Sequence, residues 1–129
     1  MRLLLDTNAY SAIMAGESGA RRLVSFAERV YLPMPVIGEL LYGFRLGNQR
    51  ELNERILHDF LGESVVSLAG VDYEVCEEYA RIGKDLRAAG KPIPTNDHWI
   101  AAIAVKNHLS LMTRDGHFKN VASLDVLHW

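Results

Sequence analysis

Apolar residues follow two patterns along this chain: short continuous runs, and longer stretches in which apolar side chains recur three and four positions apart. The short runs predict buried strands, and the longer stretches predict amphipathic helices. The predicted strands cover residues 3–5, 31–34, 64–68, 109–113 and 124–127. The predicted helices are a short one capped by Asn8 or Ser11 and ending near Gly16, then 18–29, 36–44, 47–61 and 72–89, and a last one capped by Thr95 or Asn96.

Strands that alternate with helices indicate a three-layer α/β/α domain around a mostly parallel sheet of four or five strands. Prolines at 33 and 35 leave the second strand few paired residues, and Pro35 suits the first turn of the next helix. We find no repeat, low-complexity tract or linker, and 129 residues suit one domain. The sequence therefore predicts a single domain over residues 1–129.

Four acidic residues, Asp6, Glu39, Asp97 and Asp115, lie where a predicted strand ends or within an otherwise apolar helix. Asp6 and Asp115 follow two strands directly, and ligands of open α/β sheets bind at the carboxyl ends of strands. Glu39 stands alone among apolar neighbours, and it is either a solvent-facing side chain or a functional one. Asp97 falls in the first turn of a helix, where the helix dipole alone favours an acid. We expect all four to converge on one site.

Gathered carboxylates repel one another, by about 4 kcal/mol for each pair about 4 Å apart at an effective dielectric constant of about 20. A divalent cation relieves that repulsion. Because the set contains only oxygen ligands and no cysteine or histidine, it favours Mg²⁺ or Mn²⁺ over Zn²⁺. The sequence therefore predicts a metal site that Mg²⁺ occupies and that Mn²⁺ also fits.

Composition narrows the classes of protein to consider. The content of 49% hydrophobic and 23% charged residues is that of an ordinary globular protein. A net charge of -2 argues against a nucleic-acid partner, but two bound divalent cations would reverse its sign at the site itself. The single cysteine, Cys76, excludes an internal disulfide, and we expect it on the buried face of a helix. Without an apolar run of about 18 residues or a signal-peptide pattern, we expect a cytoplasmic protein.

Four fragments occur in order and at a spacing that together carry a resemblance. They are Leu4-Leu5-Asp6-Thr7-Asn8, Val36-Ile37-Gly38-Glu39-Leu40-Leu41-Tyr42-Gly43, Pro94-Thr95-Asn96-Asp97 with Trp99-Ile100-Ala101-Ala102, and Thr113-Arg114-Asp115 with Phe118. Each fragment is a weak signal, and the four together are a strong one. Over nearly its whole length the chain resembles a PIN domain, in particular the VapC-type ribonuclease toxins of toxin–antitoxin pairs.

The resemblance implies that the four acids are the catalytic residues and metal ligands, directly or through water, and that Thr7, Asn8 and Thr113 orient them. It implies Mg²⁺-dependent hydrolysis of RNA that leaves 5′-phosphate and 3′-hydroxyl ends. It also implies partners: a cognate VapB-like antitoxin, a second copy of the chain in a homodimer, and a higher assembly of both. The segment 36–61, with Tyr42 and Phe44, is the candidate groove for the antitoxin.

Other interpretations stay open at this point. A phosphatase of the haloacid-dehalogenase type needs a second acid two residues after the first, where this chain has Asn8, and a receiver domain needs paired acids that are absent here. A PIN-like module that binds RNA or protein without cleavage remains the alternative. Arg45, Arg50 and Arg55 fit a solvated helix face better than an RNA contact. His117 follows Asp115 closely enough to reach a substrate phosphate.

Overall fold

A computed structural model describes residues 1–129 and contains one sheet of parallel strands. The strands are β1 (Arg2–Leu5), β2 (Arg29–Pro33), β3 (Val66–Ala69), β4 (Ser110–Met112) and β5 (Val126–Leu127). Their spatial order is β3-β2-β1-β4-β5, so β1 lies at the centre and β5 is an edge strand. The prediction of a mostly parallel sheet of four or five strands is confirmed.

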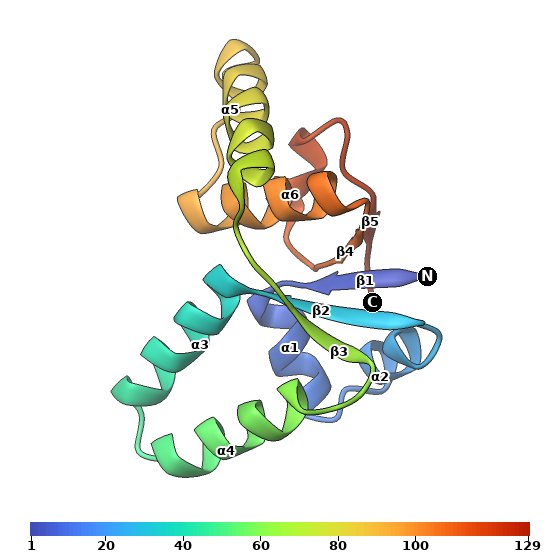
Figure 1. Ribbon diagram of the computed structural model, residues 1–129, viewed down its shortest axis with the longest axis vertical. Helices are drawn as coiled ribbons and strands as arrows, with labels where there is room; N and C mark the ends of the chain where they lie inside the picture. The colour runs from blue at the N-terminus through green and yellow to red at the C-terminus, as the bar shows by residue number, and fades with distance from the viewer.

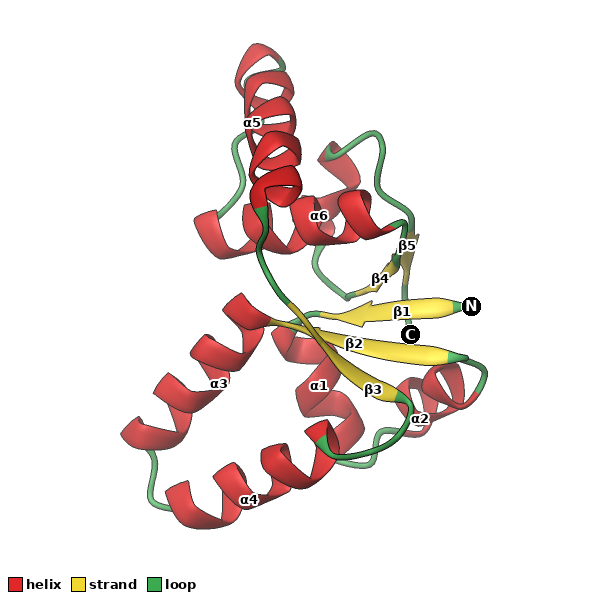
Figure 2. Ribbon diagram, in the orientation of Figure 1, coloured by secondary structure: helices red, strands yellow, loops and turns green.

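Helices cover both sides of this sheet. They are α1 (Thr7–Met14), α2 (Ser18–Ser25), α3 (Met34–Leu46), α4 (Arg50–Leu61), α5 (Tyr73–Ala88) and α6 (Thr95–Asn107), with the short 3-10 helix η1 (Gly116–Asn120) after β4. In Figure 1, α5 and α6 lie above the strands and α1 to α4 lie below them. Figure 2 shows the same layers coloured by type of structure, which confirms the predicted α/β/α architecture.

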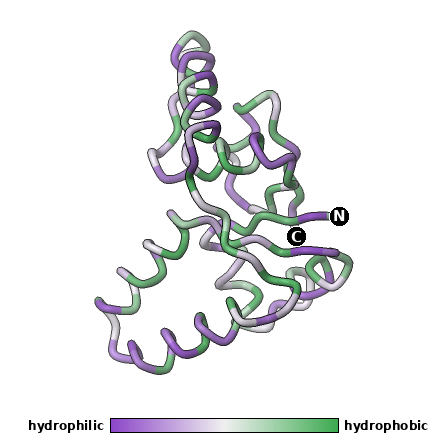
Figure 3. Tube along the Cα trace, viewed as in Figure 1, coloured by the Kyte–Doolittle hydropathy of each residue, from purple (hydrophilic) through white to green (hydrophobic).

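The core forms where apolar strands meet the apolar faces of the helices. Leu3, Leu4 and Leu5 of β1 are all fully buried, as expected of a central parallel strand that is covered on both faces. In α6 the run from Ile100 to Ala104 is buried as well. The green segments of Figure 3 mark this apolar centre, whereas α4 and α5 alternate in colour along their lengths. None of the helices combines the length and the apolarity that crossing a membrane requires.

The register of the central strands sets the position of the predicted site. Leu5 of β1 lies opposite Met112 of β4, and the Asp6 N–H extends this ladder by donating to the Met112 carbonyl at 3.4 Å. Asp6 and Thr113 therefore leave the sheet side by side, at its carboxyl edge.

The second strand is longer than predicted. It begins at Arg29, where the sequence suggested that a helix was ending, because α2 stops at Ser25 and the chain turns before Arg29 pairs with Arg2. Pro33 is the last residue of the strand and lies opposite Ala69 of β3. A proline at the end of a strand removes only one ladder hydrogen bond. The pairing is therefore not shortened, contrary to our expectation.

Two predicted helix caps are wrong. Asp6, and not Asn8 or Ser11, caps α1: its backbone is extended and its carboxylate accepts a hydrogen bond from the Ala9 N–H at 2.8 Å. The residue before α6 is Pro94, with an extended backbone, so Thr95 and Asn96 lie within the first turn. At both helices, therefore, the side chains that the sequence indicated as caps do not cap the helix.

The long helix α5 confirms its prediction, with Val75, Ile82 and Leu86 buried and Gly90 beyond its end at φ +66°. Cys76 of this helix is exposed, so its predicted core position is wrong, because the buried stripe runs through its neighbour Val75.

The apolar surface of α3 is also less buried than its sequence suggests. Only Val36 and Leu40 of this helix are buried, and Leu41, Tyr42 and Leu46 are exposed.

Candidate active site

The four acids come from four different elements around the carboxyl edge of the sheet. Asp6 follows β1 and caps α1, and Asp115 follows β4 and caps η1. Glu39 lies in α3, which begins directly after β2, and Asp97 lies in the first turn of α6. Parallel strands place all their carboxyl ends at one edge, so side chains more than a hundred residues apart in sequence can meet there.

Asp6 is buried and held on both carboxylate oxygens. Its side chain is 5% exposed, and Oδ1 accepts from the Ala9 N–H at 2.8 Å. Oδ2 accepts a short hydrogen bond from the hydroxyl of Thr113, a residue that is completely buried. The Thr113 oxygen in turn accepts from the Asp115 N–H at 2.9 Å. Thr113 therefore links the two acids that follow the neighbouring strands.

Glu39 is half-buried and is also held on both oxygens. The Thr7 hydroxyl donates to Oε2 at 2.7 Å, and the Asn96 side-chain amide donates to Oε1 at 2.6 Å. These two donors belong to the first turns of α1 and α6. Glu39 thus connects α3 to the start of α1, which Asp6 caps, and to α6, which carries Asp97. Of the two interpretations that the sequence left open, the solvent-facing side chain is therefore the wrong one.

Asp97 and Asp115 form a tighter group with His117. One carboxylate oxygen of each acid and one ring nitrogen of His117 all lie within 4.8 Å of one another. The Asp115 carboxylate accepts from the His117 N–H at 2.9 Å, and the same oxygen lies 3.4 Å from the His117 Nε2. Asp97 has no hydrogen-bond donor within the protein, so its oxygens stay available to a ligand.

The electrostatics show that the four carboxylates interact. Burial raises the pKa of Asp6, the hydrogen bonds from Thr113 and Ala9 oppose that rise, and the charges of Asp115 and Glu39 add to it. Burial also raises the pKa of Asp97, to about 6, helped by the negative charges of Asp115, Glu39 and Asp6 and opposed by His117. The charges of Asp115 and Glu39 thus disfavour the ionised forms of both Asp6 and Asp97, and a cation at this place would oppose that effect.

The residues predicted to support the acids differ in their positions. Thr7 and Thr113 each donate to one of the acids, whereas Asn8 is exposed and its side chain makes no hydrogen bond. The sequence did not single out Asn96 as a partner of Glu39, because an asparagine before a helix is ordinarily a cap. The sequence indicated His117 only as a substrate contact. Its position two residues after Asp115 was the signal that His117 could belong to the site itself.

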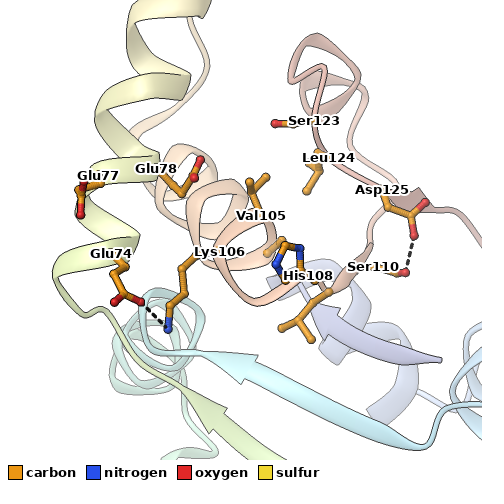
Figure 4. Close-up of a pocket in the computed structure, with 12 residues that line it drawn as sticks. Glu74, Glu77, Glu78, Val105, Lys106, His108, Ser110, Ser123, Leu124 and Asp125 are labelled. Carbon is orange, nitrogen blue, oxygen red and sulfur yellow. Dashed lines mark hydrogen bonds and ion pairs between the residues drawn. The ribbon is translucent and has the colours of Figure 1, made fainter.

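A pocket lined mostly by polar and charged residues beside α6 is a different place. Figure 4 shows this pocket of about 640 Å³, which lies between α5, α6 and the segment before β5 and includes Lys106, His108 and Ser110. Ser110 is the first residue of β4, and Asp115 follows the end of that strand. The pocket is therefore at the opposite edge of the sheet, and none of the four acids lines it.

The donor set fits a divalent cation. Carboxylate oxygens suit Mg²⁺ or Mn²⁺, and the absence of thiolate from the set argues against a structural zinc site. The structural observation that supports this fit is the grouping of the carboxylates, because oxygens of Asp97 and Asp115 lie within 4.8 Å of each other. Burial, with the added charges of Asp115 and Glu39, raises the pKa values of both Asp6 and Asp97.

Comparison with known proteins gives a family match over nearly the whole chain. The PIN domain family matches residues 3–124. Toxin FitB of Neisseria gonorrhoeae is 34% identical over 125 residues, which cover 88% of this chain and 87% of that protein. Ribonuclease VapC4 of Mycobacterium tuberculosis is 29% identical over 98% of this chain and 95% of its own length.

Solved structures agree with the fold. The FitAcB structure from Neisseria gonorrhoeae aligns with a TM-score of 0.76 at 28% identity, over 97% of this chain and 96% of that one. The structure of VapBC2 from Rickettsia felis, bound to a DNA fragment from its promoter, aligns with a TM-score of 0.89 at 24% identity, over 100% of this chain and 99% of that one. At that level of identity the second comparison supports the fold alone.

Proposed function

This chain belongs to the PIN domain family, and from that premise we propose that it is a metal-dependent endoribonuclease of the VapC type. The observation that carries the proposal is the convergence of Asp6, Glu39, Asp97 and Asp115 at the carboxyl edge of the sheet. The nearly full-length similarity to proteins named ribonuclease and toxin supports it. We take residues 1–129 as a single PIN domain.

The four acids are the proposed metal ligands, with Mg²⁺ as the ion and Mn²⁺ as a substitute. When bound, a divalent cation supplies positive charge that polarises the phosphodiester and assists the activation of water. Asp97 and Asp115 offer carboxylate oxygens with free lone pairs, and they come from different elements, α6 and the turn that begins η1. Asp6 is fixed more firmly, because both of its oxygens already accept hydrogen bonds.

Thr113 and Thr7 are proposed to position the ligands. Thr113 holds Asp6 and the backbone of Asp115 in one network, and Thr7 holds Glu39 together with Asn96. Fixed ligands cost no reorganisation when substrate binds, which is how preorganised charge accelerates a reaction. Asn8 keeps its proposed supporting role only through the resemblance.

The reaction proposed is hydrolysis of an RNA phosphodiester bond to 5′-phosphate and 3′-hydroxyl ends. The hydroxyl groups of Thr7 and Thr113 are held as hydrogen-bond donors to Glu39 and Asp6, and the gathered carboxylates suit a cation that activates water. Direct attack of water on phosphorus is the step that these groups suit.

The alternative is a PIN-like module that binds RNA or protein without cleavage. End-labelled total RNA, incubated with purified protein and Mg²⁺ or Mn²⁺, separates the two functions. We expect discrete cleavage products that disappear with EDTA and with Asp6→Asn, and that persist with Asp59→Asn, an exposed carboxylate on α4. Equal product patterns for the wild type and Asp6→Asn, or RNA binding without cleavage in either metal, would refute the enzyme and favour the binding module.

The biological role proposed is that of a toxin neutralised by a VapB-like antitoxin. The solved relatives named above are themselves a FitAcB complex and a VapBC2 complex. The antitoxin segment is proposed to lie along α3 and α4, where Tyr42 is 67% exposed and Phe44 is half-buried against the core. We also propose that the chain forms a homodimer, and a higher assembly when the antitoxin is bound.

The exposed aromatic ring of Tyr42 allows a direct test of that groove. Tyr42→Ala should weaken binding of the antitoxin by at least about tenfold, because a large aromatic side chain in the centre of an interface often contributes 2 kcal/mol or more, roughly thirtyfold. Tyr73→Ala is the matched control, since Tyr73 is 79% exposed at the start of α5. Calorimetric titration that finds the same affinity for both variants as for the wild type would exclude this groove.

A further inference from the structure

We propose that His117 is a nitrogen ligand of the metal centre, beside Asp97 and Asp115, and that it raises the affinity of the site for Mn²⁺ more than for Mg²⁺. This inference rests on the proposed metal-dependent function and extends it to the choice of ion. It concerns a residue that lies outside the four acids.

The local backbone aims the His117 side chain at the acids. Asp115 caps η1, and its carboxylate accepts the His117 N–H at 2.9 Å, which closes a tight turn between the two residues. Phe118, the next residue, is completely buried and anchors the turn in the core. The His117 ring is thereby folded back over the carboxylate of Asp115, with Nε2 at 3.4 Å from Oδ1.

The distances suit a common ligand sphere. Ligands about 2.1 to 2.3 Å from one cation lie about 3 Å apart when adjacent and about 4.5 Å apart when opposite. The ring nitrogen of His117 and the carboxylate oxygens of Asp97 and Asp115 lie within 4.8 Å of one another. The three atoms therefore need only small side-chain rotations to surround an ion.

A simple ion pair between His117 and Asp115 does not account for the whole arrangement. A ring nitrogen of His117 also lies within 4.8 Å of a carboxylate oxygen of Asp97. The ring thus faces both acids, which come from different elements, and not only its chain neighbour. Its side chain is 49% exposed, so the ring can turn toward an ion without breaking a packed contact.

The chemistry of imidazole makes the inference specific. Mg²⁺ is a hard cation that prefers oxygen and keeps part of its water shell, so it gains little from a nitrogen ligand. Mn²⁺ accepts oxygen and nitrogen ligands, and imidazole is a common ligand for transition-metal ions. The loss of His117 should therefore weaken Mn²⁺ binding and leave Mg²⁺ binding nearly unchanged.

Electron paramagnetic resonance of Mn²⁺ provides the test, with no need for substrate. We expect pulsed spectra of the wild-type protein with Mn²⁺ to show hyperfine coupling to an imidazole ¹⁴N, and His117→Ala to lose it. We also expect His117→Ala to raise the Kd for Mn²⁺ about tenfold, the lower end of what tuning of a metal site achieves, with a change in the Kd for Mg²⁺ of less than about twofold. His58→Ala, an exposed histidine on α4, is the matched control and should behave as the wild type.

Four results would overturn the inference. Mn²⁺ bound without ¹⁴N coupling would remove His117 from the ligand sphere, and equal losses of Mn²⁺ and Mg²⁺ affinity in His117→Ala would remove its effect on the choice of ion. Weaker RNA binding by His117→Ala with unchanged metal affinities would make it a phosphate contact instead. A wild-type protein that binds neither ion would refute the proposed metal-dependent function as well, so failure of the function is distinguishable from failure of the ligand assignment.

Discussion

Asp97 should destabilise the metal-free protein at neutral pH, and Asp97→Asn should remove that effect. The carboxylate lies half-buried in the first turn of α6, without a hydrogen-bond donor, and faces the charges of Asp115, Glu39 and Asp6. Asparagine has nearly the same shape and no charge. The substitution therefore leaves the packing intact and eliminates the repulsion.

The magnitude follows from the pKa of Asp97, which rises from 3.8 to about 6 in the folded protein. A difference of this size corresponds to about 3 kcal/mol if it is fully effective. Because the site is open to solvent, screening reduces the expected gain of Asp97→Asn to about 1 to 2 kcal/mol. With an unfolding entropy of about 2.1 cal/mol/K per residue, that gain raises Tm by about 4 to 8 °C.

The sign of the pH dependence follows from the protons bound. Between pH 3.8 and about 6 the folded protein keeps the proton on Asp97 while the unfolded chain has lost it. The free energy of unfolding that Asp97 contributes therefore falls as pH rises through this range, and the loss is complete above about pH 7. The stability gain of Asp97→Asn should be full at pH 7.5 and about one third as large at pH 4.5.

Urea unfolding in EDTA, followed by circular dichroism at the two pH values, measures this gain. Asp59→Asn should change the free energy of unfolding by less than about 0.5 kcal/mol at both. Mn²⁺ at about 100 times its Kd for the wild type should stabilise the wild type by about 2.7 kcal/mol and Asp97→Asn by less, which reduces the difference between them. An Asp97→Asn protein no more stable than the wild type in EDTA at pH 7.5, or a gain that does not vary with pH, would refute the reasoning.

Two further predictions concern a support of the site and the packing of α5 against α6. Thr113→Val should lower the free energy of unfolding by about 1 to 3 kcal/mol, because it removes the donor to Asp6 and the acceptor for the Asp115 N–H in a buried place; a urea midpoint equal to that of the wild type would contradict it. Gly83→Ala should cost about 1 to 3 kcal/mol, since its Cβ would lie 2.9 Å from Cε1 of His98. In a His98→Ala background the same change should instead stabilise α5 by up to about 1 kcal/mol, and a thermal melt that finds equal losses in both backgrounds would exclude the clash.

The main features of the site could be predicted because they follow from the strands. The run from Leu3 to Leu5 ends at Asp6, and the second such run ends just before Asp115. Since both strands are parallel, their carboxyl ends share one edge of the sheet, and no knowledge of loop conformation is required. Glu39 lies beside the other acids, but its apolar neighbours were a weaker sign of burial than the sequence suggested, because Leu41 and Tyr42 are themselves exposed.

The hydrogen-bond partners of the acids could not be predicted, because the same residue type serves two purposes. In the sequence, Asn96 at the start of a helix predicts a cap. In the structure the extended Pro94 precedes the helix, so Asn96 lies within the first turn and its amide is free to donate to Glu39. Asp6 is the converse case, since it both caps α1 and belongs to the site. For His117 the sequence gives a separation of two residues, but the turn closed by Asp115 decides where the ring points.

The hydrogen bonds divide the four acids into two pairs with different tasks. Asp6 and Glu39 each accept on both oxygens from fixed donors, so their positions are set by the fold. Asp97 and Asp115 keep oxygens free of protein donors, so their negative charge is the part of the site that only a ligand can neutralise. Asp6→Asn should therefore weaken metal binding chiefly through the lost negative charge. Asp97→Asn and Asp115→Asn should each also remove a carboxylate oxygen that is open to a ligand. A ranking of metal affinities in which substitution of Asp6 costs more than substitution of Asp97 would contradict this division.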